Sequence, residues 1–486
     1  MLVYKIKNMK VRNYIYILLA GIVTLASCKK SFLEEENPTA VAVESSITTE
    51  TGMLTAISGM YTSMKSYTLF GRNLPVLGDL LADNSYVSIT NSGRYLTENN
   101  YTYIATASEI DEIWSQAYNT ILQANRILYA SVPASDNVNQ LRGEAYATRA
   151  LVYLQLVNLY GQPYTVNPSA AGVPIVTQPT YTTGAFTKPA RSSVSAVYDR
   201  IITDLDSAYT LMPATTPAIH DANSNFLSKY AAKAIEARAY LYKGDYANAR
   251  DAALLVANNG GFSLAASSSA FSAYWASATN RTDKLETIFE LNMSSTVNNG
   301  YNGLDAIYNQ DGYGDVLCTD DLYNSYTATD FRKSLILDGT RTPYQAYIVN
   351  KYQNVLQSDR DEVKVVRYAE VLLTLAESYA QLGDSGEALT YLNRVAQLRD
   401  PSLAAYTATG TTLVADILNE RRKELAFEGY RFFDLTRTAA VINRPQEGAK
   451  SAASIATVTT ANTRRILPIP QVEINANASI TQNPGY

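Results

Sequence analysis

The sequence predicts a mainly α-helical protein, in which helical hairpins form a scaffold with long irregular loops and a few short β-strands. Three observations predict this fold class. Apolar residues recur every three or four positions over long stretches, which is typical of amphipathic helices. Two pairs of these stretches share the same small residues and the same glycine turn. Between these pairs lie about one hundred residues without helical periodicity.

Three helices are expected in the first half of the chain. The first is indicated by a helical stripe of apolar residues (Ile110, Ile113, Trp114, Ala117, Ile121 and Leu128). The second is expected over 140–160, because Gly161 and Pro163 follow it and both residues end helices. The third is expected over 193–211 and stops before Pro213.

Two helical hairpins are expected further along the chain, over 227–258 and 368–399. Five residues recur at a constant offset of 139 positions: Ala237, Tyr240, Gly244, Asp245 and Ala249 correspond to Ala376, Tyr379, Gly383, Asp384 and Ala388. This pattern resembles degenerate tetratricopeptide repeats, in which small residues and a glycine turn let helices stack closely. Two unrelated hairpins that share common residues are the alternative interpretation.

The segment 260–360 is expected to be rich in loops. It contains many Asn, Ser, Gly, Tyr and Asp residues, and short strands are expected only over 286–293 and 346–352. Segments 83–103 and 161–189 have a similar character. Because long loops in compact proteins often carry function, we expect these segments to hold the ligand-binding residues.

Composition and charge exclude several classes of protein. The 486 residues include 40 Lys+Arg and 45 Asp+Glu, and a net charge of −5 lacks the basic field that nucleic acids attract. The single histidine, His220, excludes a multi-histidine metal site, and two cysteines exclude a disulfide framework. The chain has 37 Tyr against 11 Phe and 2 Trp, and tyrosine is an aromatic residue that tolerates water at its polar tip.

The N-terminus predicts export and lipidation. Four basic residues precede an apolar run over 14–26, which is too short for a membrane span and fits the core of a signal peptide. The run ends in Leu25-Ala26-Ser27-Cys28, which resembles a bacterial lipobox. We therefore expect a signal peptide over 1–27, lipidation of Cys28 and a polar tether over 28–50. An ordinary signal peptide with a chance cysteine is the alternative.

The most specific sequence signature lies near the C-terminus. Residues 417–437 read ILNERRKELAFEGYRFFDLTR, and the chain ends in a Leu467-Pro468-Ile469-Pro470 block followed by Gln482-Asn483-Pro484-Gly485-Tyr486. The first resembles the ER-x-x-EL-x-EG-x-R-x-x-DL motif of the SusD/RagB family, and the second resembles the PIP…QNPGY ending of that family. Blocks at 114–125, 149–161 and from Arg367 onward agree. The members of the SusD/RagB family are surface nutrient-binding lipoproteins of Bacteroidetes.

The resemblance implies a fold and a function. It implies four tetratricopeptide-like helix pairs, with a helical region over 51–260, a loop-rich ligand-binding region over 261–360 and a C-terminal region over 361–486. It implies a lipoprotein at the extracellular side of the outer membrane, which binds a glycan and delivers it to a SusC-like TonB-dependent transporter. No catalytic residue, metal or cofactor is expected. A peptide-binding protein of the RagB type, with the same transporter partner, is the alternative.

Glycan recognition suggests which loop residues contact the ligand. Aromatic rings stack on the CH faces of sugars, while amides, carboxylates and arginines bind the hydroxyl groups. The loops offer ten candidates: Tyr86, Arg94, Tyr95, Tyr101, Tyr274, Trp275, Tyr301, Asn302, Tyr308 and Tyr313. Trp275 is the strongest single candidate, because a tryptophan in a Ser/Ala/Asn-rich loop has little local core to join.

A surface glycosidase is disfavoured. Glu420, Glu424 and Glu428 recur every four residues and are expected on one helix face, where paired carboxylates could suggest glycoside hydrolysis. The nearby Arg421 and Arg431 favour structural ion pairs instead.

Four other polar or reactive side chains are also expected to be non-catalytic. His220 is expected in a surface loop and Cys318 as a small buried residue. Asp311 and Asp315 flank glycines, but the spacing of an EF-hand is absent.

Overall fold

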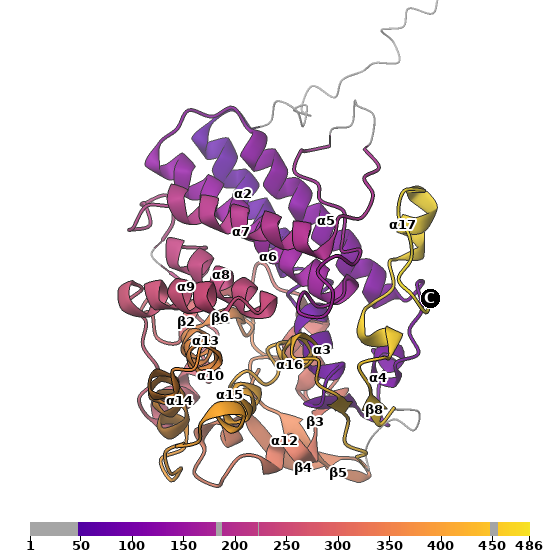
Figure 1. The fold of residues 1–486 in the computed structure, drawn as a ribbon, viewed down its shortest axis with the longest axis vertical. Coiled ribbons are helices and arrows are strands. Elements are labelled where there is room, and N and C mark those ends of the chain that lie inside the picture. Colours follow the sequence, from indigo (N-terminus) through magenta and orange to yellow (C-terminus); the bar gives the residue numbers. More distant parts are fainter. Residues whose placement is uncertain (1–46, 181–186, 222, 448–454) are drawn as a thin grey trace, which may run out of the picture. The chain divides into compact units, whose positions relative to one another are not determined.

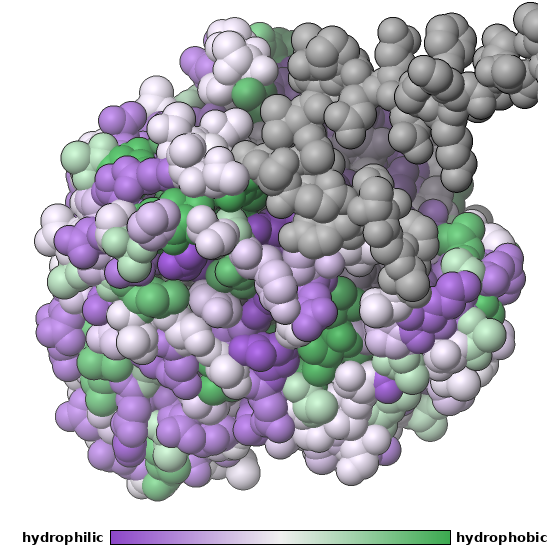
Figure 2. All heavy atoms as spheres, turned by 90° about the horizontal axis from the view of Figure 1, so that it is seen from above, coloured by the Kyte–Doolittle hydropathy of each residue, from purple (hydrophilic) through white to green (hydrophobic). Residues whose placement is uncertain are grey.

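The computed structural model describes residues 47–180, 187–221, 223–447 and 455–486. The predicted signal peptide, the lipobox with Cys28 and nearly all of the tether lie outside these residues. No helix among the described residues is long and apolar enough to cross a membrane. On the face shown in Figure 2, hydrophobic residues gather in small groups among hydrophilic ones.

Helices stacked in succession form the scaffold, as predicted. Four pairs pack together: α2 with α5, α6 with α7, α8 with α9, and α13 with α14; contacts between α5 and α6, α7 and α8, and α9 and α13 join successive pairs. Figure 1 shows this stack, with α2, α5, α6 and α7 at one end. The bounds are α2 Glu50–Lys65, α5 Ser108–Tyr129, α6 Asp136–Tyr160, α7 Val194–Leu211, α8 Lys229–Lys243, α9 Tyr246–Asn259, α13 Tyr368–Gln381 and α14 Ser385–Arg399.

Serine side chains set the start of several scaffold helices. The hydroxyl oxygens of Ser135, Ser193 and Ser228 each accept a hydrogen bond from the backbone N–H three residues later, at 3.1, 3.1 and 3.2 Å. Such N-caps satisfy backbone donors that have no partner inside the helix. The cap at Ser135 explains why α6 begins four residues before the expected position 140.

The two hairpins with matching residues have the same turn. Gly244 and Gly383 both adopt left-handed conformations, with φ of 78° and 87°, which favour glycine. In each turn, the N–H of the following aspartate donates to the carbonyl of the tyrosine five residues earlier, at 2.9 Å. The four matched alanines are buried, and α9 of the first hairpin packs on α13 of the second. The matching residues therefore have the same structural role in both hairpins.

Short strands lie beyond the helical stack. β1 (Ser85–Val87), β3 (Val316–Cys318), β5 (Tyr344–Val349) and β4 (Ile336–Arg341) form an antiparallel sheet in this order, which Figure 1 shows at the end opposite α2. Its register places Tyr86 opposite Leu317. β2 (Thr287–Leu291) pairs with β6 (Val363–Arg367), and β7 (Ile442–Asn443) with β8 (Thr457–Val458). The strands expected over 286–293 and 346–352 correspond to β2 and to the second half of β5.

The loop-rich region is less irregular than expected, because several short helices occur in and around it. Within it lie α10 (Ser268–Ala276), α11 (Leu304–Tyr308), α12 (Asp320–Asn324) and the 3-10 turns Gly300–Asn302 and Phe331–Leu335. Elsewhere, short helices are α3 (Asn73–Leu80), α4 (Leu96–Asn100), α16 (Arg431–Arg437), α17 (Gln471–Ala476) and the turn Thr463–Arg465. The longer α15 (Gly410–Glu424) packs on α13.

The three glutamates of the signature form buried ion pairs, as expected, but not in the expected way. Helix α15 ends at Glu424, so Glu428 lies in the turn before α16 and not on the same helix face. Their arginine partners are distant in sequence: Arg332 pairs with Glu420, and Arg367 pairs with both Glu424 and Glu428. Glu420 also pairs with Lys423, three residues away. The neighbouring arginines pair elsewhere, since Arg421 contacts Asp434 and Arg431 contacts Asp83.

His220 is not a surface residue, contrary to expectation. Its Nε2 lies 2.8 Å from a carboxylate oxygen of Glu144, and its ring stacks on Phe226 with 3.8 Å between ring centres. The side chain is buried because its loop folds against α6, which sequence composition does not reveal. Cys318 is buried in β3, as expected, and burial raises the pKa of its thiol.

Candidate ligand-binding site

Six of the ten candidate ligand contacts are buried. Each is at most 4% exposed, so no ring face is available to a ligand: Tyr86, Tyr95, Tyr101, Tyr274, Trp275 and Tyr308. Their hydroxyl groups bind other parts of the chain where partners exist. The hydroxyl of Tyr101, for example, donates to the carbonyl of Leu81, and that of Tyr274 lies 2.8 Å from Thr287 Oγ1.

Trp275 belongs to a small second core, so the argument that singled it out is wrong. It lies in α10, where it packs against Phe271 and Tyr274. Lys351 and Arg367 lie over its ring, at 4.2 and 5.2 Å from the ring centre. These cations come from positions far along the chain, and they cover a residue that local composition suggests is exposed.

Three other candidates come together at the surface, from two separate loops. The guanidinium carbon of Arg94 lies 3.7 Å from the ring centre of Tyr313. Tyr313 meets Tyr301 edge to face, with 6.4 Å between ring centres. Tyr301 is 51% exposed, and its neighbour Asn302 is also exposed.

Two residues that sequence analysis missed complete this group. The guanidinium carbon of Arg72 lies 4.6 Å from the ring centre of Tyr67, and its Nε donates to the hydroxyl of Tyr95 at 2.8 Å. Tyr95 is the residue after Arg94. On the other side, the N–H of Tyr67 donates to Asn299 Oδ1 at 3.2 Å, two residues before Tyr301. These contacts connect the two groups of residues into one cluster. We call Tyr67, Arg72, Arg94, Tyr301 and Tyr313 the Tyr–Arg cluster.

A glycine permits the close approach of the two chain segments in the cluster. A Cβ atom at Gly71 would lie 2.1 Å from the carbonyl oxygen of Lys65 and 2.4 Å from Asn299 Nδ2. That Nδ2 donates to the same Lys65 carbonyl at 2.8 Å. Any larger residue at position 71 would therefore push the loop that carries Tyr301 away from Tyr67.

Further arginines brace the loops of the cluster. Arg341 donates to the carbonyl of Tyr313 and to Gln310 Oε1, both at 2.9 Å, and it pairs with Asp315 at 3.6 Å. Arg360 pairs with Asp305 at 2.8 Å and lies 5.8 Å from the ring centre of Tyr301. Asp315 also accepts from the N–H of Ser92, so it braces the loop. The described residues include no group of three or more Asp, Glu, His or Cys placed to hold a metal ion.

A polar groove of about 490 Å³ adjoins the Tyr–Arg cluster. It runs between α2, α5 and the loop before Tyr301; Tyr67 belongs to both the cluster and the groove, and Asn299 also lines the groove. Its other walls carry mainly hydroxyl and amide groups: Thr62, Ser63, Ser66, Gln116, Asn119, Gln123 and Asn298. Ligand sites typically enclose about 300–1,000 Å³, so the groove is large enough for a small ligand or part of a chain.

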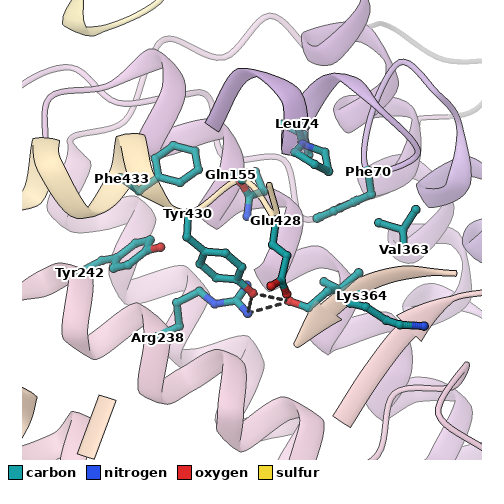
Figure 3. A pocket seen from close by; sticks show the side chains of 13 residues that line it. Phe70, Leu74, Gln155, Arg238, Tyr242, Val363, Lys364, Glu428, Tyr430 and Phe433 are labelled. Carbon is teal, nitrogen blue, oxygen red and sulfur yellow. Dashed lines mark hydrogen bonds between the residues drawn. The ribbon is translucent and has the colours of Figure 1, made fainter. Parts of the chain in front are cut away.

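Two other hollows fit a ligand less well. The cavity in Figure 3 has a volume of about 30 Å³, which suits a water molecule and not a sugar. There, Arg238 donates to the hydroxyl of Tyr430 and to the carbonyl of Val365, and all three lie inside the protein. A hollow of about 430 Å³ includes Trp114, but this indole is buried and its N–H points to Glu473.

Comparison with known proteins connects this architecture to one family. Residues 338–486 match the model of the SusD family, and residues 31–241 match a family described as starch-binding and associating with the outer membrane. The SusD-like protein P2 of Formosa agariphila is 27% identical, over 98% of this chain and 100% of that protein.

Solved structures agree over nearly the whole chain. A SusD superfamily protein from Bacteroides thetaiotaomicron has a TM-score of 0.79 and 27% identity, covering 90% of this chain and 100% of that one. Another, from Bacteroides vulgatus, has a TM-score of 0.81 and 26% identity, covering 90% and 99%.

Proposed function

Because the chain belongs to the SusD/RagB family, we propose that it captures an extracellular glycan and delivers it to a SusC-like TonB-dependent transporter. As a SusD-like protein it acts by binding and is not an enzyme. The family matched by residues 31–241 is described as starch-binding and associating with the outer membrane, which supports both the ligand class and the location.

One observation carries the choice of ligand site: an exposed tyrosine ring lies near a groove of hydroxyl and amide groups. Tyr301 is exposed, Tyr67 is half-buried, and Asn299, which accepts a hydrogen bond from the N–H of Tyr67, lines the groove. Sugar rings present flat CH faces and a rim of hydroxyl groups, which these two kinds of protein surface complement. The groove is open, so a long chain could pass through it with only a few sugar units bound.

The proposed attachment to the membrane rests on Cys28. A diacylated or triacylated cysteine would anchor the protein durably, because each buried methylene contributes about 0.8 kcal/mol. The polar segment 28–50 would then connect the anchor to the first scaffold helix. Such a tether lets the folded part hold a ligand in front of a transporter while it stays at the membrane surface.

The proposal is tested by glycan binding to the chain from Lys29 onward, which removes the predicted signal peptide and the lipidated cysteine. Affinity gels and calorimetry should show binding to at least one polysaccharide, with no product formed on long incubation. Tyr301→Ala should weaken that binding. Absence of any glycan binding, together with peptides bound to the protein purified from membranes, would instead establish the peptide-binding alternative.

The transporter partnership needs its own experiment. The full-length lipoprotein, carrying an affinity tag, should retain a TonB-dependent transporter when purified from outer membranes in mild detergent. If only unrelated abundant outer-membrane proteins were retained, the proposed delivery to a transporter would be rejected.

A further inference from the structure

We propose that the glycan is anionic, and that Arg94 binds its uronate carboxylates or sulfate esters. This inference rests on the proposed function and adds the chemical class of the substrate. It follows from the hydrogen bonding of Arg94 in the Tyr–Arg cluster, which differs from that of the arginines around it.

Arg94 is held in place but lacks an anionic partner. Its guanidinium carbon lies over the ring of Tyr313, 3.7 Å from the ring centre, and Nη1 donates to Ser92 Oγ at 2.7 Å. No carboxylate in the described part of the chain pairs with it. Stacking on an aromatic ring orients a guanidinium and leaves its edge donors free, which is the arrangement that binds carboxylate or sulfate oxygens.

Arg72 lies on the other side of the cluster and is buried, with 5% of the residue exposed. Its Nε donates to Asn73 Oδ1 and to the hydroxyl of Tyr95, and its guanidinium lies near the rings of Tyr67 and Tyr95. Arg72 therefore positions these two tyrosines from inside the protein, and Arg94 is the arginine that faces the ligand.

The neighbouring arginines behave differently. Arg341 pairs with Asp315, and Arg360 pairs with Asp305. The site thus neutralises the arginines that brace its loops and leaves Arg94 at its surface with unused donors. Lys65, at the end of α2, also lines the groove and makes no ion pair within the described ranges.

The charge of the whole chain makes this local arrangement informative. A net charge of −5 would repel a polyanion, so binding would require cations placed where the sugar lies. An arginine can bind a carboxylate or sulfate through two parallel hydrogen bonds, while Tyr301 contacts the sugar ring. A neutral glycan would leave the edge of the Arg94 guanidinium without a charged acceptor.

Matched polysaccharides test the proposal. We would compare uronate-containing and sulfated polysaccharides with their carboxyl-reduced and desulfated counterparts, which keep the same backbone without the charge. At least one charged form should bind tenfold or more tightly than its neutral counterpart, and its affinity should fall as salt is raised. The pair that shows the difference identifies carboxylate or sulfate as the bound group.

Variants assign the effect to the cluster. Arg94→Gln should weaken binding of the charged glycan tenfold or more and weaken binding of its neutral counterpart much less, whereas Arg94→Lys should retain part of the affinity. Arg250→Gln, on the distant helix α9, is the matched control and should have no effect. Thermal unfolding would confirm that each variant is folded.

The remaining outcomes overturn one or both proposals. Equal affinity for charged and neutral counterparts, unaffected by Arg94→Gln, would reject the anionic class but retain the glycan-binding function. Failure to bind every polysaccharide in the panel would reject the glycan-binding function itself, and the anionic class with it.

Discussion

Arg367 and Glu424 are 57 positions apart in sequence, yet Arg367 Nη1 lies 2.9 Å from Glu424 Oε1 and both side chains are buried. Glu424 also accepts hydrogen bonds from Arg332 and Arg399, at 3.2 and 3.1 Å. Burial disfavours its ionisation, but the guanidinium groups of Arg399, Arg367 and Arg332 outweigh burial and hold the pKa of Glu424 well below its ordinary value. The carboxylate is therefore a structural anion that holds three arginines.

Loss of this carboxylate should be strongly destabilising. Glu424→Gln leaves three buried arginines short of a negative charge, and breaking one side of a buried ion pair costs about 3–5 kcal/mol. Urea unfolding followed by circular dichroism would measure the change. Asp251→Asn, which alters an exposed carboxylate, is the matched control and should stay within about 0.5 kcal/mol of the parent protein. A loss no larger than that of the control would contradict the structural role of Glu424.

A second buried carboxylate should make stability fall as pH rises. Burial and the charge of Glu290 raise the pKa of Glu362 to about 8, against an ordinary value near 4.5. Between these values the folded protein holds a proton that the unfolded chain has released, so the free energy of unfolding should decrease from about pH 4.5 to pH 8.

Removal of that titrating group should remove its part of the pH dependence. Glu362→Gln should be more stable than the parent protein at pH 8.5, with the difference shrinking towards pH 5. Urea midpoints across this range would measure it. Glu387→Gln, at an exposed position of α14, should show no such trend. Parallel curves for Glu362→Gln and the parent protein would contradict the prediction.

Substitution by alanine should change the free energy of unfolding in opposite directions at two nearby glycines of the second hairpin. Gly383 has φ of 87°, so Gly383→Ala should destabilise the protein by about 1–2 kcal/mol. Gly386 lies in α14, where a Cβ would meet only an ordinary contact, so Gly386→Ala should stabilise it by up to about 1 kcal/mol. Chemical unfolding of both variants measures the two effects, and equal signs would argue against the left-handed turn.

An exposed tyrosine of the Tyr–Arg cluster should contribute directly to glycan affinity. Tyr301→Ala should weaken binding by about 1–3 kcal/mol, by analogy with stacking of nucleic-acid bases on aromatic side chains. Calorimetry with the glycan found in the panel would measure it. Tyr129 has a similar exposure, 55% against 51%, at the end of α5, so Tyr129→Ala serves as the control. Equal affinity of both variants would remove Tyr301 from the site.

The predicted anchor can be tested in cells. Cys28→Ala should move the protein from the membrane fraction to the soluble fraction, because the thiol that carries the acyl chains is lost. Fractionation and detergent partitioning would follow this change. A Cys318→Ala variant, which alters only the buried cysteine of β3, should stay in the membrane fraction. Unchanged partitioning of Cys28→Ala would defeat the lipoprotein assignment.

The scaffold could be predicted where local interactions dominate. Gly244 and Asp245 define a turn by their own conformational needs, so the hairpin is visible in sequence. Helix α2 was not predicted, because it contains Gly52 and Gly59 and has a weak apolar stripe, and it is stabilised by packing on α5 and α6. Helix α10 was not predicted either, because it is short and rich in serine. Its apolar residues Phe271 and Trp275 are buried only once the chain has folded.

The binding site was harder to predict, because burial depends on distant residues. Arg94, Tyr301 and Tyr313 are in loops that composition identifies as functional, and the structure brings them together. Tyr67 and Arg72 were missed because they follow α2 directly, in a segment without a compositional signal. Trp275 was misjudged because the cations that cover it come from β6 and the residues after β5.

The buried ion pairs around Glu424 also have a consequence for the order of events in folding. Arg399 contacts Glu286 across 113 positions, and Arg332 contacts Glu424 across 92. Because such long loops must close before the charges meet, the segments that carry these ion pairs should fold slowly compared with the neighbouring helix pairs, which need only local contacts. Partial opening of these segments is also costly, because the release of one segment leaves buried charges on the others without their ion-pair partners. Hydrogen exchange in these segments should therefore proceed by one cooperative opening and not by fraying from their ends.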